Sequence, residues 1–443
     1  MKHTRTTGLI FILLAFQFSA RAQNHLWTLS ECLDYAREHN IGVQREKLKV
    51  EEGDVRLNSS KSERLPEVNA VAGEVFSFGN YYSTTGRMEP NPYSGNNNLT
   101  YTSGRIEMDV PIFEGLRINN QIKADESALN AVRADLELLE KNLDIKVAGK
   151  FLECLYYKGM VEVADSQVKT STLLVERAEA LVSEGSRPRS EYAEAESQLM
   201  SDKYSLTDAE GQYKLKLLDL QKAMNIPPDE EFAVADIDGL PEVPAMIPEE
   251  AVEYWPSITA AKARIDQSNS LVKVARAKFY PSLSFTAAIS TYYVKMFQSD
   301  FAFSNFGRQF FSENPNEVLG LNLKIPIFNR FSTRNNVKLA ELKVRDMHLE
   351  LADSKQSISL EMQDAYTKTR VAYDKYLASD RAVEAAKIAM DYAFDSYDAG
   401  KGSVYDYQQS RQKYVSACNN LLQAKYSYLI YNRILELYRS GSN

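Results

Sequence analysis

The stretch Val110-Pro111-Ile112-Phe113 returns as Ile325-Pro326-Ile327-Phe328, 215 positions further along the chain. Two more pairs share this spacing: Leu65-Pro66-Glu67-Val68 with Tyr280-Pro281-Ser282-Leu283, and Gly185 with Gly400. Each match is short, but three matches in one order and at one spacing indicate an internal duplication. The 443-residue chain is therefore expected to contain two structural repeats, residues 23–241 and 242–443, joined within the proline- and acid-rich stretch 225–249.

Two long stretches without proline predict very long helices. Proline is absent between Ile112 and Arg187, and again from Ile327 to the end of the chain. A proline inside a helix costs about 3 kcal/mol, so these gaps suit uninterrupted helices. The expected helices are 117–182 and 189–224 in the first repeat, and 331–398 and 403–438 in the second. At about 1.5 Å per residue, the longer helix of each pair reaches roughly 100 Å, which is a coiled-coil length.

Apolar residues along these helices recur mostly at steps of three and four positions. One series lies in each repeat: Val132, Leu136, Leu139, Leu143 and Val147, then Met347, Leu351, Ile358, Met362 and Ala365. Such spacing packs one helix against another. We therefore expect two long antiparallel coiled-coil hairpins, residues 117–224 and 331–438, which turn at 183–188 and at Gly400 and Gly402.

Alternation with a period of two predicts strands before each long helix. The expected strands are 67–78, 105–113, 281–293 and 318–328. In the second of them, the apolar residues Ile106, Met108 and Val110 alternate with Arg105, Glu107 and Asp109. One apolar and one polar face is typical of a strand between two different environments. A half-buried sheet of a soluble protein is the alternative, whereas an export signal and the helix lengths favour lipid on one face and water on the other.

The loops between the paired strands differ from each other. Residues 79–104 are rich in Gly, Asn, Ser and Tyr, whereas residues 296–318 carry six phenylalanines: Phe297, Phe301, Phe303, Phe306, Phe310 and Phe311. The pattern leaves three interpretations of these rings open: contact with a membrane interface, a cover over a pore mouth, or ordinary packing of the loop.

The first 22 residues have the composition of an export signal. Lys2 and Arg5 precede the apolar stretch 8–16, and Ala20-Arg21-Ala22 forms an A-x-A cleavage site. A buried N-terminal helix is the alternative. No cysteine follows the cleavage site, so a lipoprotein-type anchor is not expected, and no later apolar run is long enough for a membrane-spanning helix.

Composition argues against several functional classes. The net charge of −8 and the pI near 5.4 are unfavourable for a nucleic-acid surface. Three cysteines and four scattered histidines do not form a disulfide framework or a metal-binding pattern. We therefore expect no cofactor, no metal and no nucleic-acid partner.

The complete layout resembles the TolC family of outer-membrane efflux proteins, from Trp27-Thr28-Leu29 to about Leu437. The resemblance implies a mixed α and β fold in which each protomer of a homotrimer gives four strands to a 12-stranded transmembrane β-barrel. The long helices of the tandem repeats would form an α-barrel in the periplasm. The short helices at about 41–64 and 189–224 look like the stacked pair that matches a long helix in that family.

The resemblance also implies candidate site residues near the second glycine turn. Asp406 matches a constriction aspartate and Tyr397 a gating tyrosine, whereas Gln409 and Gly402 replace an expected aspartate and arginine. A single ring of three Asp406 carboxylates is the prediction, and a helix-start aspartate favoured by the helix dipole is its alternative. The other candidates are Glu191 at the gate, Gly185, Arg187, Gly400, Lys401 and Gly402 as adaptor contacts, and Pro66, Pro111, Pro281 and Pro326 at strand–helix junctions.

The predicted function is that of a channel in the outer membrane, not of an enzyme. It would conduct drugs, small molecules or exported proteins in a tripartite efflux or type I secretion system. No phosphate-binding G-x-x-x-x-G-K-[ST] sequence is present, so the energy would come from an inner-membrane RND or ABC transporter through a periplasmic membrane-fusion adaptor. The alternatives are a non-conducting periplasmic coiled-coil bridging protein and an exported hydrolase, for which no nucleophile-elbow or zinc-type spacing is present.

Overall fold

The computed structural model describes residues 26–78, 99–228, 232–237, 239, 246–297 and 304–440. The expected signal sequence at 1–22 lies outside the described residues. The chain forms two compact units: Met1–Lys49, Arg133–Ala260 and Ala352–Asn443 make up the first, and Val50–Val132 and Ala261–Leu351 the second. Each unit therefore takes parts of both expected repeats, so the units cut across the sequence duplication.

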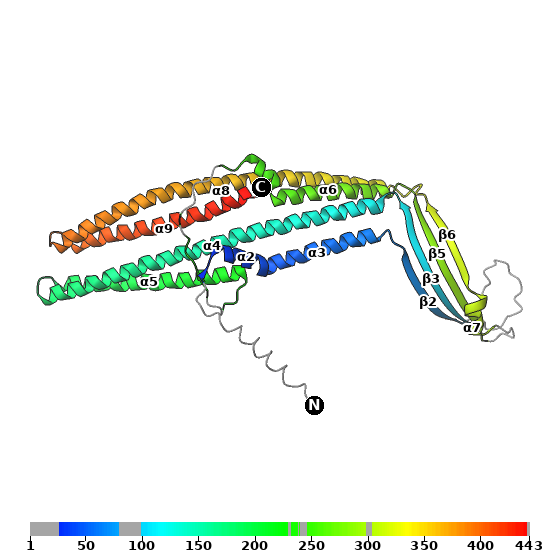
Figure 1. Ribbon diagram of the computed structural model, residues 1–443, viewed down its shortest axis with the longest axis horizontal. Helices are drawn as coiled ribbons and strands as arrows, with labels where there is room; N and C mark the ends of the chain where they lie inside the picture. The colour runs from blue at the N-terminus through cyan, green and yellow to red at the C-terminus, as the bar shows by residue number, and fades with distance from the viewer. Residues whose placement is uncertain are drawn as a thin grey trace, which may run out of the picture. The chain divides into compact units, whose positions relative to one another are not determined.

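Four long helices dominate the chain: α4 (Arg117–Ser183), α5 (Arg189–Met224), α8 (Ser332–Asp398) and α9 (Val404–Ser440), as Figure 1 shows. Every predicted end of these helices agrees with the observed end to within two residues. The helices α4 and α8 each contain 67 residues, which corresponds to roughly 100 Å. Among the described helices, none is both long enough and apolar enough to cross a membrane.

The core of the first unit lies where α4 and α5 pack against the N-terminal helix α2 (Leu29–His39). Phe151, Leu152 and Leu155 of α4 are fully buried there, together with the predicted seam residues Leu143 and Val147. Helix α2 begins with a reciprocal cap in which the Glu31 N–H donates to Thr28 Oγ1 and the Thr28 N–H donates to Glu31 Oε2. Burial raises the pKa of Cys32 and of Cys154 in this core to about 12, so both remain thiols.

The segment expected to be a plain linker contains a strand. Residues β4 (Ala233–Val234) pair in parallel with β1 (Leu26–Trp27), and the Ala235 N–H donates to the Trp27 carbonyl oxygen at 2.9 Å. The Phe232 ring lies 5.7 Å from the Trp27 ring, and Lys158 of α4 forms an ion pair with Asp236 at 2.8 Å. The described part of residues 225–249 is thus packed onto the first unit. The shorter helices outside the sheet region are η1 (Glu249–Tyr254), α3 (Ile41–Ser62) and α6 (Pro256–Ala277), and the short elements α7 (Phe306–Arg308) and η2 (Gln309–Glu313) lie between two strands of the sheet.

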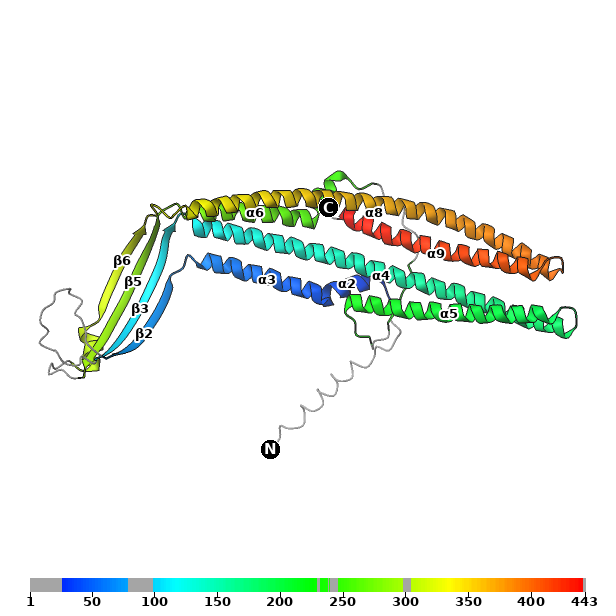
Figure 2. The ribbon, with the colours of Figure 1, turned by 180° about the vertical axis from the view of Figure 1, so that it is seen from behind.

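The second unit contains a four-stranded antiparallel sheet with the order β2-β3-β5-β6, seen from behind in Figure 2. Its strands are β2 (Glu67–Ser77), β3 (Leu99–Glu114), β5 (Ser282–Met296) and β6 (Asn316–Lys324). Three strand ends differ from the prediction by more than two residues, because a strand extends only as far as its partners. Strand β3 starts at Leu99, where it pairs with Ser77 and Met296, and β6 ends at Lys324, where it pairs with Ser282.

Three of the four predicted junction prolines lie outside the strands, and one lies inside a strand. Pro66, Pro281 and Pro326 lie between a helix and a strand, as predicted. Pro111 instead lies within β3, where the register shifts between Pro111 and Phe113. Proline has no N–H to donate, and a bulge is one of the few places in a sheet that tolerates it.

In the part of the sheet next to the helices, the strand register separates two chemically different faces. On the apolar face lie Val68, Ala70, Ala72, Ile106, Met108, Val110, Phe285, Ala287, Ile289, Leu319, Leu321 and Leu323. On the polar face lie Glu67, Asn69, Arg105, Glu107, Asp109, Ser284, Thr286, Ser290, Asn322 and Lys324. Beyond Gly104 the pattern reverses, with Glu74, Thr100, Thr102 and Lys295 on the first face and Val75, Tyr101, Tyr292 and Val294 on the second. The polar residues bond across strands, as when Thr286 Oγ1 donates to Asp109 Oδ1 at 2.7 Å and Asn322 Nδ2 donates to Thr286 Oγ1 at 3.2 Å.

The two junctions that lead into α4 and α8 have the same unusual backbone. Gly115 and Leu116 take φ values of 62° and 65°, and Arg330 and Phe331, 215 positions later, take 54° and 60°. Left-handed residues cost roughly 1–2 kcal/mol each when they carry a side chain. The equivalent positions therefore share a conformation that is disfavoured locally, at the spacing of the sequence repeat.

Gly115→Ala is expected to destabilise the protein more than Gly185→Ala. Both glycines are left-handed, with φ of 62° and 70°, so both variants lose about 1–2 kcal/mol from backbone strain. A Cβ at Gly115 would in addition lie 2.6 Å from the Ala277 carbonyl oxygen, whereas a Cβ at Gly185 would meet nothing within 4 Å. Thermal unfolding followed by circular dichroism measures the difference. Equal shifts of the two midpoints would contradict the steric argument.

Candidate functional site

Both long hairpins turn through a left-handed glycine. At the end of α4 the Ser186 N–H donates to the Leu181 carbonyl oxygen at 3.0 Å, and at the end of α8 the Lys401 N–H donates to the Ser396 carbonyl oxygen at 2.9 Å. These bonds close the helix ends around Gly185 and Gly400. Gly402 is closely packed for a different reason, because a Cβ there would lie 2.9 Å from Ser396 Oγ and 3.3 Å from Ser396 Cβ. The predicted turn residues thus lie at the two tips, where the Lys401 side chain is exposed.

Three of the predicted residues meet beside these tips. Arg187 Nη1 lies 3.2 Å from Glu191 Oε1, and the Tyr397 O–H donates to Glu191 Oε2 at 3.4 Å. The guanidinium of Arg187 also lies 5.4 Å from the centre of the Tyr397 ring. This cluster, Arg187, Glu191 and Tyr397, joins the start of α5 to the end of α8.

The cluster is partly shielded from water, which affects the Tyr397 hydroxyl. Burial, first, and the neighbouring Glu191 carboxylate raise the pKa of Tyr397 above its usual value, although Arg187 acts in the opposite direction. The hydroxyl therefore remains protonated at neutral pH and can serve as a hydrogen-bond donor. Arg187, predicted as a contact for an adaptor, is engaged within the protomer.

Asp406 and Gln409 lie apart from this cluster on the first turns of α9. The Ser403 O–H donates to Asp406 Oδ2 at 2.7 Å, and the Asp406 N–H donates to Ser403 Oγ at 3.2 Å. This reciprocal cap accounts for an aspartate at the helix start, which is the alternative interpretation of Asp406. Both Asp406 and Gln409 remain exposed, and they are three positions apart and so neighbours on the helix surface. A three-fold ring of Asp406 stays a prediction.

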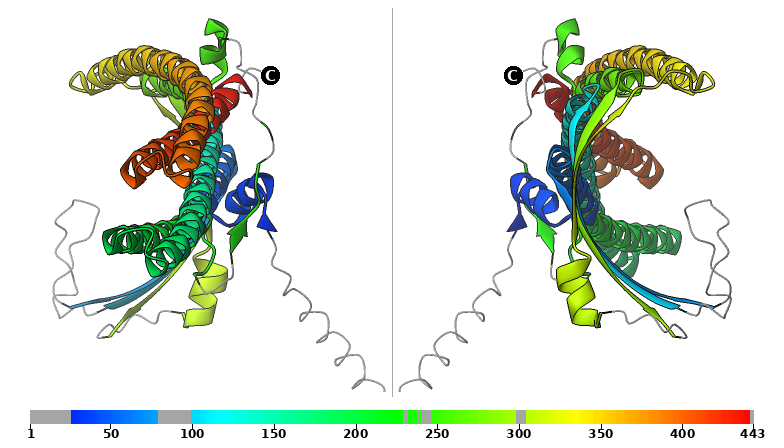
Figure 3. Two further views of the ribbon diagram at one scale, coloured as in Figure 1. Left: turned by 90° about the vertical axis from the view of Figure 1, so that its left-hand side faces the viewer. Right: turned by 90° about the vertical axis from the view of Figure 1, so that its right-hand side faces the viewer.

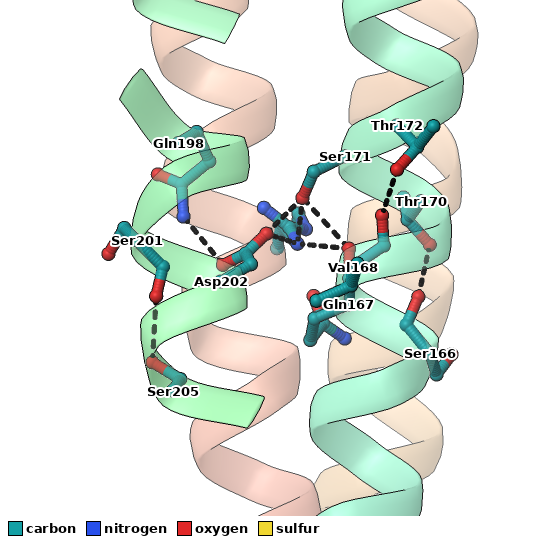
Figure 4. Close-up of polar contacts among 11 residues, drawn as sticks. Ser166, Gln167, Val168, Thr170, Ser171, Thr172, Gln198, Ser201, Asp202 and Ser205 are labelled. Carbon is teal, nitrogen blue, oxygen red and sulfur yellow. Dashed lines mark hydrogen bonds and ion pairs between the residues drawn. The ribbon is translucent and has the colours of Figure 1, made fainter. Parts of the chain in front are cut away.

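A second polar cluster, which the sequence did not reveal, lies deeper between the hairpins (Figure 4). It consists of Arg411 of α9, Asp202 of α5 and Ser171 of α4, which are 5%, 9% and 1% exposed. Arg411 Nη2 donates to Asp202 Oδ2 at 2.5 Å, to Ser171 Oγ at 3.0 Å and to the Gln167 carbonyl oxygen at 3.1 Å. We call Arg411, Asp202 and Ser171 the buried triad.

Neighbouring groups add hydrogen bonds to the triad, although the buried Arg411 Nε has no hydrogen-bond partner. The Ser171 hydroxyl donates to Asp202 Oδ2 and also lies 2.8 Å from the Gln167 carbonyl oxygen, and Gln198 Nε2 donates to Asp202 Oδ1 at 2.9 Å. Figure 4 shows Gln198 and Asp202 on one helix facing Ser171 on the other. A cavity of about 20 Å³, room for a single water molecule, separates the triad from Glu191 and Tyr397. Burial raises the pKa of Tyr407, which also lines this cavity, although Arg411 acts to lower it.

The spacing of Asp202 and Arg411 along their helices could have indicated that both are buried. Asp202 falls between Leu199 and Ala209 in a three-and-four spacing of buried residues on α5, and Arg411 follows the buried Tyr407 by four positions on α9. Opposite charges at seam positions of two helices indicate a buried ion pair. The pairing itself was not readable, because the two residues are 209 positions apart.

Comparisons with known proteins agree with this architecture. A family model described as outer membrane efflux protein matches residues 32–225 and 247–438. The outer membrane efflux protein BepC of Brucella suis is 19% identical over 404 residues, 91% of this chain and 83% of that protein. The pyoverdine export outer membrane protein OpmQ of Pseudomonas putida is 25% identical over 388 residues, 84% of this chain and 77% of that protein.

Solved structures share the fold at low identity. The structure of CusC has a TM-score of 0.80 at 17% identity and covers 95% of both chains. The CmeC outer membrane channel of Campylobacter jejuni has a TM-score of 0.80 at 18% identity and covers 93% of this chain and 85% of that chain. The predicted combination of long helices with a small set of strands is thereby confirmed.

Proposed function

Because the chain belongs to the outer membrane efflux protein family, we propose that it forms the outer-membrane channel of a tripartite efflux or type I secretion system. Family membership makes it an outer membrane protein and not an enzyme. In the proposed role it conducts solutes passively, and the energy comes from an inner-membrane RND or ABC transporter coupled through a periplasmic adaptor. The helical hairpins extend into the periplasm.

The observation that carries this proposal is the sheet with two different faces. Leu319, Leu321 and Leu323 are exposed on the apolar face of β6, whereas Asn322 and Lys324 lie on the polar face. A sheet whose apolar side is exposed suits contact with lipid, and its polar side suits a water-filled lumen. Such a lumen spares a charged solute the desolvation cost of crossing lipid.

The edges of the sheet support the proposed homotrimer. Among the strands that the structure describes, β2 and β6 each have one neighbour within the protomer, so each leaves an edge with unpaired backbone groups. Pairing β6 of one copy with β2 of the next removes these edges, and three copies close a 12-stranded transmembrane barrel. The two matched stretches of the family model support the proposed repeats 23–241 and 242–443.

The polar clusters supply a gate in this proposal. The Arg187–Glu191–Tyr397 cluster and the buried triad both connect the first hairpin to the second. Opening the periplasmic end requires the second hairpin to move away, which breaks these contacts. The tips at Gly185, Arg187, Gly400, Lys401 and Gly402 are the proposed contacts for the adaptor.

The cargo is proposed to be drugs, other small molecules or exported proteins. The names of the relatives point to different cargoes, since OpmQ is named for pyoverdine export and CusC for cation efflux. The general channel architecture is therefore a better guide to this chain than any one relative.

Reconstitution tests the proposal directly. Protein extracted from membranes with detergent is expected to migrate as a trimer after chemical cross-linking and to give discrete conductance steps in a planar lipid bilayer. A folded trimer that gives no conductance, even with its hairpin contacts weakened by substitution at Tyr397 and Arg411, would favour the non-conducting bridging protein instead.

Asp406→Asn is expected to lower cation selectivity and to weaken block by divalent cations in single-channel recordings. The variant removes one exposed carboxylate per protomer at the proposed constriction, which would be three per trimer. Gln409→Asp, one turn along the same surface, is the complementary variant and is expected to strengthen the block. Unchanged selectivity and block in an intact Asp406→Asn trimer would remove Asp406 from the gate.

A further inference from the structure

The segment between β5 and β6 was expected to be a loop, and its described part is instead a compact helical structure. It contains α7 (Phe306–Arg308) and the π-helical turn η2 (Gln309–Glu313). The aromatic segment, defined as residues 305–314, lies against one side of the sheet in both views of Figure 3. Its contacts with β5 show which edge of the sheet it occupies.

The aromatic segment takes the place of a strand at the outer end of β5. Strand β6 pairs with β5 only as far as Ser290. Beyond that point the Val294 N–H donates to Gln309 Oε1 at 3.1 Å, and Gln309 Nε2 donates to the Val294 carbonyl oxygen at 3.1 Å. Asn314, two residues before β6 begins, donates from Nδ2 to the Tyr292 carbonyl oxygen at 2.8 Å. The segment therefore continues the β6 edge of the sheet outward.

One face of the sheet carries the segment. A Cβ at Gly104 would lie 3.0 Å from Phe310 Cζ, and the Thr291 O–H donates to the Phe310 carbonyl oxygen at 2.6 Å. The Phe306 ring lies 5.2 Å from the ring of Tyr293. Gly104, Thr291 and Tyr293 continue the alternation of the apolar face, so the segment covers the outer part of that face.

Two rings of the segment remain exposed among charged groups. Phe311 is 71% exposed and Phe306 is 44% exposed, and their ring centres are 6.3 Å apart. The outer part of the same face also carries Glu74, Lys295 and Glu317. The rings thus form a small apolar patch within a polar surface, which suits contact with a second apolar patch of matching size.

A second patch of this kind lies at the opposite edge of the sheet. Phe76 at the end of β2 is 60% exposed, and Phe78, just beyond it, is 76% exposed. Phe76 pairs with Thr100 and so lies on the face that the aromatic segment covers. The segment of the same chain lies beyond β3 and β5, at strand spacings of about 4.8 Å. A second copy of the chain can bring the two patches together.

Strand lengths restrict how the two edges can meet. Strand β2 has 11 residues and β6 has 9. If every residue of β6 pairs antiparallel with β2 of another copy, Asn316 stands opposite Val75, Phe76 or Ser77. Paired residues point to the same face, and Asn316 shares its face with Val75 and Ser77 but not with Phe76. Both remaining registers place Phe78 beyond Asn316, at the aromatic segment.

We propose that the aromatic segment is a docking site for the outer end of β2 of a second copy. Phe76 and Phe78 of one protomer pack against Phe306 and Phe311 of the next. Each contact covers the outer end of one seam between protomers, where β6 has already ended. This inference rests on the proposed function, since it requires β6 of one copy to pair with β2 of the next.

Disulfide cross-linking in isolated outer membranes tests the docking. Phe78→Cys and Phe311→Cys are combined in the full chain with Cys418→Ser, because the other two native cysteines are buried. Oxidation is expected to give covalent dimers and trimers on a denaturing gel, which a reducing agent returns to monomers. Val75→Cys with Phe311→Cys is the matched control. Val75 is exposed but lies on the other face of β2, so this pair is expected to stay monomeric. Equal cross-linking of the two pairs would overturn the docking.

Two further pairs separate failure of the docking from failure of the proposed trimer. Gly320→Cys is combined with Val71→Cys for the register that pairs Asn316 with Val75, and with Gly73→Cys for the register that pairs it with Ser77. If one of these pairs cross-links and the Phe78 and Phe311 pair does not, the docking is overturned while the barrel seam stands. If neither cross-links, the proposed pairing of β6 with β2 fails, and the docking fails with it.

Alanine variants provide a second measurement without cysteines. Phe78→Ala and Phe311→Ala are each expected to lower the temperature at which the trimer separates in dodecyl sulfate. Because the two rings contact each other in the proposal, the double variant is expected to lower it no further than the more affected single variant. Shifts that add fully in the double variant would show two independent sites and contradict the contact.

Discussion

Arg411→Met is expected to lower the free energy of local opening of α5 and α9 by about 3–5 kcal/mol. The variant leaves the Asp202 carboxylate buried without its cation. Asp202 is 9% exposed and Arg411 is 5% exposed, so water compensates little for the loss. Native-state hydrogen exchange of the backbone amides in both helices measures the change. The remaining bonds from Ser171 and Gln198 to Asp202 satisfy its oxygens but do not neutralise its charge.

The matched control replaces both charges. Arg411→Met combined with Asp202→Leu removes the pair and leaves apolar side chains between the helices, which is often neutral or stabilising for a buried ion pair. Protection in the double variant is therefore expected to return toward the wild-type level. If Arg411→Met alone were as protected as the wild type, the triad would contribute no net stability to the contact between the hairpins.

Leu321→Lys has the second large expected effect. It places an ammonium on the apolar face of β6, and a lysine facing lipid near the membrane centre costs about 2–4 kcal/mol. The adjacent variant Asn322→Lys points to the polar face and loses only the bond from Asn322 Nδ2 to Thr286 Oγ1. Folding into phospholipid vesicles, followed by the change of electrophoretic mobility on heating, compares the two. Equal losses would mean that the faces do not meet different solvents.

The long helices were predictable because their signals are local. Absence of proline and an apolar spacing of three and four act along one helix, and the turns at Gly185 and Gly400 require a left-handed residue that glycine supplies. The strand ends were not predictable in the same way. The start of β3 at Leu99 and the end of β6 at Lys324 depend on partners in other strands, so they are set by pairing and not by composition.

Polar contacts were likewise predictable only where the two residues are close in the sequence. The position of Asp406 at a helix start was anticipated as an alternative, whereas its reciprocal cap with Ser403, which spans three positions, was not named. The Tyr397–Glu191 contact spans 206 positions and the Arg411–Asp202 pair spans 209. Tyr397 and Glu191 were each named as candidates from the sequence but were not paired, and nothing connected Arg411 to Asp202 before the helices were placed together.

The pairing of β3 with β5 makes the two sequence repeats depend on each other for one continuous sheet. Ile106 stands opposite Ile289, and Gly104 stands opposite Thr291, so residues encoded at distant points of the gene are cross-strand neighbours. A substitution in one half is therefore tested against its partner in the other half. Variants of the two repeats can therefore be compatible or incompatible with each other across this pair of strands, although the repeats lie far apart in the sequence.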